Sequence, residues 1–465
     1  MDREMPDTRE KTLRLALELG RRVGSHKIVD DPDILASYAK DESDAEPRLP
    51  DVALRAECEA DVLAALELAE KTDVPVTPRG AGTGKSGGAI AAEGGLVLDC
   101  TRLNRVVEVS REDLLAVVEP GVVTGQLQAL LAGEGLFYPP DPNSLETCTI
   151  GGNVAHNAGG PRAFKYGVTR QYVLGLTLGL VGGARLEVGR RTVKGVAGYD
   201  LTALLVGSEG TLGAFTRVTL RLLRNPPVMA TLLVRFRDEV TAGTAVSRIV
   251  AQGLVPRVLE LMDGVVVDTL RRAGAGAIPD GTGALLLIEA DGPTEADVDD
   301  QVTRLAAECE SAGAIDVLMA KHAGERDRLW AARRVLSDAI KERARHKVAE
   351  DIAVPRSRAA ELLMGLRVVG ERHKVVVASY GHAGDGNFHV NVLWDDDGFD
   401  PKPCLGDIFR LALALKGTIT GEHGVGLAKR AYLPWEQSGE VIALQKRLKV
   451  AFDPRGLMNP GKIWL

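Results

Sequence analysis

The chain has 465 residues, a formal net charge of −7 and 45% hydrophobic residues, a composition typical of globular proteins. The length predicts two or three domains, and the acidic balance argues against nucleic acid as the main partner. No apolar run reaches the roughly 20 residues of a membrane span, and the charged N-terminus lacks a signal-peptide core. The five cysteines have no C-x-x-C spacing, which excludes the usual iron–sulfur and zinc-ribbon frameworks and favours free thiols in a reducing cytoplasm.

The hydrophobic pattern predicts the following elements in chain order. Residues 1–45 are expected to be helical, and a helix that ends near Lys71 precedes a glycine-rich stretch. From residue 96 to 223 the pattern predicts short strands and turns, with one helix near residues 125–132. The segment 138–160 is rich in proline, glycine and asparagine and reads as a long functional loop. A domain boundary is expected at residues 225–227.

Beyond this boundary, alternating strands and helices predict an α+β or α/β layer. Strands are expected at residues 229–236, 284–290, 375–377 and 388–392, and helices at 240–252, 295–312 and 325–344.

The glycine-rich stretch, residues 78–88, contains five glycines and lies between two predicted strands. Glycine lets backbone amides approach a ligand closely, and consecutive amides form an anion-binding nest. The letters nearly match a Walker A loop, but Arg79 stands where the opening glycine is required. They also match the dinucleotide pattern, yet a strand follows where that pattern needs a helix. A phosphate ligand is therefore expected, and a plain hairpin turn is the alternative.

Four segments, residues 78–88, 138–160, 196–201 and 207–213, together resemble the flavin enzymes of the vanillyl-alcohol oxidase type. Their order and spacing are similar to the glycolate oxidase large subunit and to the D-lactate and D-2-hydroxyglutarate dehydrogenases, over nearly the whole chain. The resemblance implies an α+β fold with a two-lobed FAD-binding domain of the PCMH type and an α+β substrate (cap) domain. The expected parts are an N-terminal helical segment at 1–46, the FAD-binding domain at 47–225, the cap domain at 226–419, and a C-terminal segment at 420–465 that completes the active site.

The resemblance also implies the cofactor. FAD is expected to bind non-covalently, because residues 80–88 lack the histidine to which many relatives attach flavin. The implied FAD-binding residues are Pro78, Arg79, Gly80, Ala81, Gly82, Thr83, Gly84, Ser86, Gly87, Pro140, Asp141, Thr149, Gly151, Gly152, Asn153, Ala158, Gly159, Glu209, Gly210 and Asn459.

Two segments near the C-terminus, residues 381–389 and 420–426, hold three of the eight histidines. Two histidines with a carboxylate suit zinc, manganese or a similar ion. His382 and His389 are separated by an odd number of residues, so a straight strand would point them apart. The turn between them contains two glycines that could bend the chain and bring them together. The residues alone leave open a second reading, in which the histidines are buried and hydrogen-bonded without a metal.

The resemblance assigns roles to these residues. It implies that His382, His389 and Glu422 bind a divalent metal, zinc or manganese, and that His423 is the general base. A metal on the substrate hydroxyl lowers its pKa, and a neutral histidine can then take the proton. The flavin is expected to take the Cα hydride on its N5 side.

A hydroxy acid also needs a partner for its carboxylate, and Arg333 is expected to supply it, because arginine binds carboxylates in a fork. A solvated surface charge is the alternative for this arginine-rich helix. Ser337 and Asn391 match substrate-contacting positions of the resembled enzymes. Ala349 stands where the hydroxyglutarate enzymes have a lysine, which favours lactate or glycolate, although Lys347 is near.

The predicted function is therefore FAD-dependent, metal-assisted oxidation of a D-2-hydroxy acid to the 2-oxo acid. The electrons are expected to pass to a separate electron-transfer protein, a quinone or a partner subunit. Four alternatives stay open: a D-2-hydroxyglutarate dehydrogenase, a non-redox enzyme like alkylglycerone-phosphate synthase, a catalytically silent electron-transfer subunit and a flavin-binding structural partner. A cytoplasmic location is expected, with peripheral membrane association and a homodimer left open.

Overall fold

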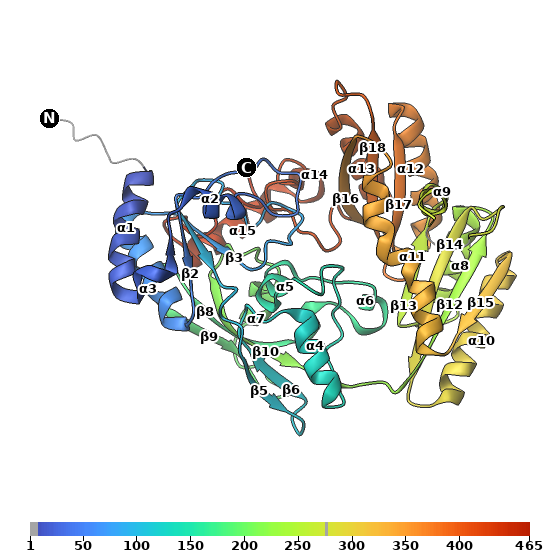
Figure 1. Cartoon of the computed structure of the whole chain (residues 1–465), viewed down its shortest axis with the longest axis horizontal. Helices are drawn as coiled ribbons and strands as arrows, with labels where there is room; N and C mark the ends of the chain where they lie inside the picture. Colours follow the sequence, from blue (N-terminus) through green and yellow to red (C-terminus); the bar gives the residue numbers. More distant parts are fainter. Residues whose placement is uncertain (1–7, 275–277) are drawn as a thin grey trace. The chain divides into compact units, whose positions relative to one another are not determined.

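The computed structural model describes residues 8–274 and 278–465. Its contacts divide the chain into two compact units. The first unit comprises Met1–Gly159, Val168–Asn225 and Glu422–Leu465, and the second comprises Gly160–Gly167 and Pro226–Gly421 (Figure 1). The sequence predicted four parts, and that division remains a proposal in addition to these two units. Residues 1–7 of the expected helical segment lie outside the described residues.

The described part of the first unit contains a four-stranded, a five-stranded and a two-stranded sheet. The four-stranded sheet has the order β1 (Ile28–Val29), β2 (Val52–Arg55), β4 (Leu96–Asp99), β3 (Val76–Arg79). The antiparallel five-stranded sheet has the order β5 (Val106–Ser110), β6 (Leu115–Val118), β10 (Ala214–Arg221), β8 (Val173–Gly179), β9 (Arg185–Gly189). The third sheet pairs β11 (Leu223–Arg224) with β7 (Leu136–Phe137).

Helices pack around these sheets. They are α1 (Thr8–Val23), α2 (Pro32–Leu35), α3 (Glu59–Thr72), α4 (Thr124–Gly133), α5 (Ile150–His156), α7 (Leu201–Leu205), α14 (Leu433–Glu436) and α15 (Gly439–Phe452), with 3-10 turns at Ser25–Lys27, Ala36–Tyr38 and Thr169–Gln171. The predicted helix near residues 125–132 is confirmed as α4, and the glycine-rich stretch does lie between two strands, β3 and β4. None of the described helices is long and apolar enough to cross a membrane.

Two expectations about the first unit are wrong. Ile28 and Val29 form a strand that pairs with β2, inside a region expected to be helical. Residues 138–160 were expected to lack secondary structure, but they contain α5. Thr149 caps this helix by accepting the backbone N–H of Gly152. Both elements are too short for a hydrophobic period to reveal them, and glycines at the start of α5 lower its helix propensity.

The second unit is built on one antiparallel sheet. Its order is β15 (Asp316–Ala320), β12 (Val228–Phe236), β14 (Ala284–Gly292), β13 (Val258–Met262), β17 (Val376–His382), β18 (Asn387–Trp394), β16 (His346–Ala353). Its helices are α6 (Ala163–Tyr166), α8 (Glu239–Ala251), α9 (Gly264–Arg272), α10 (Glu295–Ser311), α11 (Ala323–Lys341), α12 (Ala359–His373) and α13 (Lys402–Ala414), with a 3-10 turn at Arg356–Arg358. The α+β layer predicted beyond residue 227 is confirmed.

Helices cover both faces of this sheet, and every residue of the interior strand β14 is therefore buried. Leu336 and Ile340 of α11 share a core with α9 and with Ala378 and Tyr380 of β17. The helices α8, α10 and α12 pack together against the other face (Figure 1). Alternate residues of β17 therefore point toward α11, and this face carries the two histidines of the site described below, His382 and His389.

Candidate active site

The C-terminal segment of the first unit lies against the glycine-rich stretch. The backbone N–H of Leu427 donates to the carbonyl of Ser86 at 2.8 Å, and that of Asn459 donates to Val76 at 2.7 Å. The Asn459 side chain donates to the carbonyl of Gly88 at 3.0 Å. Residues more than 300 positions apart in the sequence thus line one region of the first unit.

The loops of this region approach one another so closely that several of the glycines cannot be replaced without movement. A Cβ on Gly80 would lie 2.4 Å from the hydroxyl of Thr149. Gly210 has a φ of +69°, and its Cβ would lie 2.7 Å from the ring of Pro78. Gly80 is needed because a Cβ would collide with Thr149, and Gly210 is needed also because glycine accepts a positive φ without strain. Three of the segments that carry the family resemblance therefore converge here.

Some buried polar atoms in these loops have no hydrogen-bond partner within the described part of the chain. Among them are Oγ of Ser86, Oγ of Ser208 and Oδ1 of Asn459. Buried polar atoms are nearly always paired in folded proteins, so these atoms fit a polar ligand such as a dinucleotide. Ser208 lies within the segment 207–213 but was not among the predicted cofactor residues. Its burial, which the sequence does not reveal, is what marks it as a candidate.

Two predicted cofactor residues direct their side chains to the protein itself. The guanidinium of Arg79 donates to the carbonyl of Lys40 at 2.9 Å. The carboxylate of Glu209 accepts the backbone N–H groups of Val425 and Gly426 at 2.8 and 2.7 Å. These contacts fix the N-terminal segment and the C-terminal segment to the cofactor loops, and direct contact of Arg79 or Glu209 with FAD stays a prediction.

The other predicted cofactor residues lie in the same loops of the first unit. Asn153 is buried and donates to the hydroxyl of Thr124 at 2.7 Å, and the carbonyl of Pro140 accepts from Gln128 at 2.8 Å. The remaining predicted residues lie within the glycine-rich stretch and the segment 138–160. They are Ala81, Gly82, Thr83, Gly84, Gly87, Asp141, Gly151, Gly152, Ala158 and Gly159.

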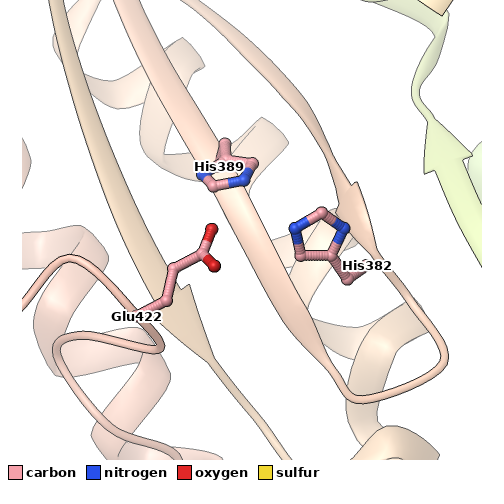
Figure 2. A group of neighbouring side chains, drawn as sticks. All are labelled: His382, His389 and Glu422. Carbon is pink, nitrogen blue, oxygen red and sulfur yellow. The ribbon is translucent and has the colours of Figure 1, made fainter. Parts of the chain in front are cut away.

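The second group of the site consists of two histidines and a glutamate. The strands β17 and β18 form a hairpin that places His382 and His389 on the same face, because His389 is directly opposite Tyr380 in the register. Glu422 follows Gly421, whose backbone N–H donates to the buried carboxylate of Asp351 at 2.7 Å. One potential ligand atom from each of the three residues lies within 4.8 Å of the others (Figure 2).

This donor set fits a divalent metal ion. Both histidines are buried, with 2% and 6% of their surface exposed, and their ring centroids lie 5.4 Å apart with the rings nearly perpendicular. Two imidazoles and one carboxylate form a common protein site for zinc and suit manganese as well. The turn between the histidines bends as the two glycines indicated, with a φ of +82° at Gly386.

A buried carboxylate that sequence reasoning missed connects this group to Arg333. Glu260 of β13 is completely buried and accepts from Nδ1 of His382 and from Nε of Arg333 at 2.9 Å. Burial acts to raise the pKa of Glu260, but the charges of His382 and Arg333 outweigh it and hold that pKa below its ordinary value. The signal in the sequence is a single acid within the otherwise apolar strand Val258–Met262.

Arg333 and Asn391 are also buried in the second unit, whereas Ser337 is exposed on α11. The Arg333 guanidinium lies 4.8 Å from the centroid of the Tyr380 ring. Asn391 follows His389 by two residues on β18 and therefore shares its face of the sheet. His423 belongs to the first unit, where its carbonyl oxygen lies 3.0 Å from Nδ1 of His156.

Comparisons with known proteins identify the family. Residues 50–189 match the model described as FAD binding domain, and residues 225–463 match the FAD linked oxidases, C-terminal domain. The chain belongs to the FAD-linked oxidases. It is 38% identical to the glycolate oxidase subunit GlcD of Bacillus subtilis over 92% of each chain. It is also 35% identical to the D-lactate dehydrogenase of Anaerostipes hadrus over 89% of each.

A solved structure confirms the predicted fold class. The structure of p-cresol methylhydroxylase with substrate bound matches 98% of this chain and 97% of its own, with a TM-score of 0.82 and 16% sequence identity. The FAD-linked oxidase has the vanillyl-alcohol oxidase type of fold, and FAD is its cofactor. The loops with buried polar atoms described above are the region of the first unit that fits this cofactor.

Proposed function

We propose that this FAD-linked oxidase is a D-2-hydroxyacid dehydrogenase that converts a short acid, lactate or glycolate, to the 2-oxo acid. The observation that carries the proposal is the group formed by His382, His389 and Glu422. Glu260 connects this group to Arg333, because its carboxylate contacts both His382 and Arg333. A 2-hydroxy acid has a carboxylate and a hydroxyl on neighbouring carbons, and this group offers an arginine for the first and a metal site for the second. The names of the glycolate oxidase and D-lactate dehydrogenase relatives support the same chemistry.

Arg333 would bind the substrate carboxylate. Its guanidinium is held between Glu260 and the ring of Tyr380, so little side-chain freedom remains to be lost when the substrate arrives. A planar guanidinium binds a carboxylate through two parallel hydrogen bonds. Asn391, on the same face of the sheet, would donate a further hydrogen bond, and Ser337 is proposed as a third contact.

His423 would take the proton of the substrate hydroxyl at its side chain. The backbone next to it is fixed within the first unit, because Glu209 holds the N–H groups of Val425 and Gly426. A fixed backbone limits the positions that the imidazole can reach, and a positioned base contributes about 10²–10⁴-fold to such a rate.

Two bound groups would complete the chemistry. FAD, when bound, supplies the acceptor for the hydride that leaves Cα. A divalent ion held by His382, His389 and Glu422, zinc or manganese, supplies the positive charge that lowers the pKa of the substrate hydroxyl. The electrons are proposed to pass on to a separate electron-transfer protein, a quinone or a partner subunit. The name of the Bacillus subtilis relative, a glycolate oxidase subunit, favours the last of these.

The direct test is anaerobic reduction of the bound flavin. We expect the visible absorbance of the oxidised flavin to disappear when D-lactate or glycolate is added and to persist with L-lactate. D-2-hydroxyglutarate and its L form complete the series. If the absorbance persists with every acid while flavin stays bound, the hydroxyacid assignment is wrong, and the non-redox or silent-subunit functions take its place.

Ala349 is expected to set the preference for a short acid. The register of β16 and β18 places Ala349 directly opposite Asn391 and Asp351 opposite His389, so Ala349 lies on the face that carries the site. A small apolar residue here gives a second substrate carboxylate no cationic partner. The alternative substrate is D-2-hydroxyglutarate. Lys347 favours it, because this lysine lies on the same face two residues away and could pair with a second carboxylate.

Replacing Ala349 with lysine should therefore shift the specificity. We expect A349K to raise kcat/KM for D-2-hydroxyglutarate relative to D-lactate by about tenfold or more, the effect of roughly 1.4 kcal/mol of added ion pairing. The matched control is A349M, which adds similar length without charge and should lower both rates together. An unchanged ratio in A349K would show that the second carboxylate does not reach this strand, and Lys347 would then be the next position to change.

A further inference from the structure

We infer that Glu260 is a positioning residue that couples recognition of the substrate carboxylate to the metal site, an inference that rests on the proposed function. The structure assigns to it two simultaneous tasks: it orients the ring of His382 toward the metal, and it fixes the guanidinium of Arg333. These residues come from β17 and α11, whereas Glu260 lies on β13, so one carboxylate joins three elements of the second unit.

The position of Glu260 makes a passive role difficult to explain. The side chain is fully buried in a strand whose other residues are valine, leucine and methionine. Moving a carboxylate out of water costs several kcal/mol, which only good pairing offsets, and buried ion pairs often add little net stability. An apolar residue would therefore serve the core of the sheet at least as well.

The contact with His382 determines which ring nitrogen can bind a metal. Glu260 and His382 are directly opposite each other in the antiparallel register, and Oε1 of Glu260 accepts from Nδ1 of His382. A carboxylate on Nδ1 keeps a proton there and leaves the lone pair on Nε2. One ring nitrogen of His382 faces His389 and Glu422 and the other points away from them (Figure 2). A carboxylate behind a ligating histidine fixes its tautomer and raises its basicity.

The contact with Arg333 fixes the other half of the site. Nε of Arg333 donates to Oε2 of Glu260 at 2.9 Å, so the two oxygens of one carboxylate are divided between the arginine and the histidine. Tyr380 adds a second restraint, because its ring lies 4.8 Å from the guanidinium carbon and 5.4 Å from the centroid of the His389 ring. The carboxylate-binding arginine and the metal-binding histidine are thereby held at one fixed separation, as a two-point contact with a 2-hydroxy acid requires.

The test is the variant E260Q, which removes the charge but keeps the shape. In the FAD-loaded protein we expect its affinity for Zn²⁺, measured by competition with a chromogenic chelator, to fall about 10–100-fold. We expect the KM for D-lactate to rise as well, because Arg333 loses its fixed orientation. FAD content should stay at the wild-type level, because the cofactor loops belong to the first unit.

The matched control is D263N. Asp263 lies just beyond the same strand, is also buried, and accepts the backbone N–H groups of Val266 and Ser379. D263N is expected to change stability but neither the affinity for Zn²⁺ nor the KM. If E260Q changes these two quantities no more than D263N does, Glu260 is a structural ion-pair residue and the inference is wrong.

The shorter variant E260D keeps the test decisive if E260Q does not fold. It retains the charge but cannot reach both partners, so we expect it to weaken either Zn²⁺ binding or the KM for D-lactate; wild-type values for both would overturn the inference. Failure of the proposed function gives a different result, since the wild-type protein would then not reduce its flavin with any hydroxy acid. If wild-type protein oxidises D-lactate yet binds no Zn²⁺ or Mn²⁺, the coupling to a metal is wrong and the dehydrogenase assignment stands.

Discussion

Replacing His423 with glutamine is expected to lower kcat/KM for the hydroxy acid by about 10²–10⁴-fold. Glutamine has a similar length and can hydrogen-bond to the substrate hydroxyl, but it cannot take up the proton. Substrate binding should change much less, because the carboxylate is proposed to be held by Arg333 and Asn391. The measurement is the rate of anaerobic flavin reduction at several substrate concentrations, which separates the maximal rate from the apparent dissociation constant.

The pH dependence gives this prediction a second readout. In the wild-type protein the rate should fall at low pH as the base becomes protonated, and this decrease should be absent from H423Q. His373, at the end of α12, provides the control. It pairs with Asp407 at 2.9 Å and has no proposed role in the site. H373Q should keep both the rate and its pH profile. A rate in H423Q within about threefold of wild type would mean that another group takes the proton, since one positioned base contributes far more than that.

The features that could be predicted from the sequence are those that depend on neighbouring residues. The five glycines of residues 78–88, between two short apolar runs, indicated a loop between strands, and β3 and β4 bear this out. The turn that brings His382 and His389 together could be inferred from glycines within the same hairpin. In each case the deciding residues lie within about ten positions, so local backbone preferences settle the conformation.

The features that could not be predicted depend on residues that meet only in the folded chain. Glu260 precedes Arg333 by 73 residues and His382 by 122, and nothing near Glu260 in the sequence marks either partner. The burial of Ser208 likewise results from loops that are distant in the chain. The strand β1 has only two residues and exists because β2 pairs with it, so no hydrophobic period could predict it.

Replacing His389 with alanine is expected to remove the metal site and with it most of the activity. The variant loses one of two imidazole ligands, and two remaining protein ligands rarely hold zinc when structural and catalytic sites use three or four. Loss of the charge that lowers the pKa of the substrate hydroxyl should reduce the rate of flavin reduction by about 10²-fold or more, since that charge contributes several kcal/mol. Metal content by elemental analysis and flavin reduction by D-lactate are the two measurements.

Removal of the metal from the wild-type protein should reproduce this result in a reversible form. Chelation is expected to lower the rate, and added Zn²⁺ or Mn²⁺ should restore it in wild-type protein but not in H389A. His346 provides a matched control, because it lies at the start of β16 in the same sheet and pairs with Asp397 at 2.7 Å; H346A should keep its metal and its rate.

A chelated wild-type protein with full activity would contradict a metal role. Because His382, His389 and Glu422 are brought together from a hairpin and a distant segment, they would then have to serve the substrate directly as hydrogen-bonding groups, and H389A would raise KM without the larger loss in maximal rate.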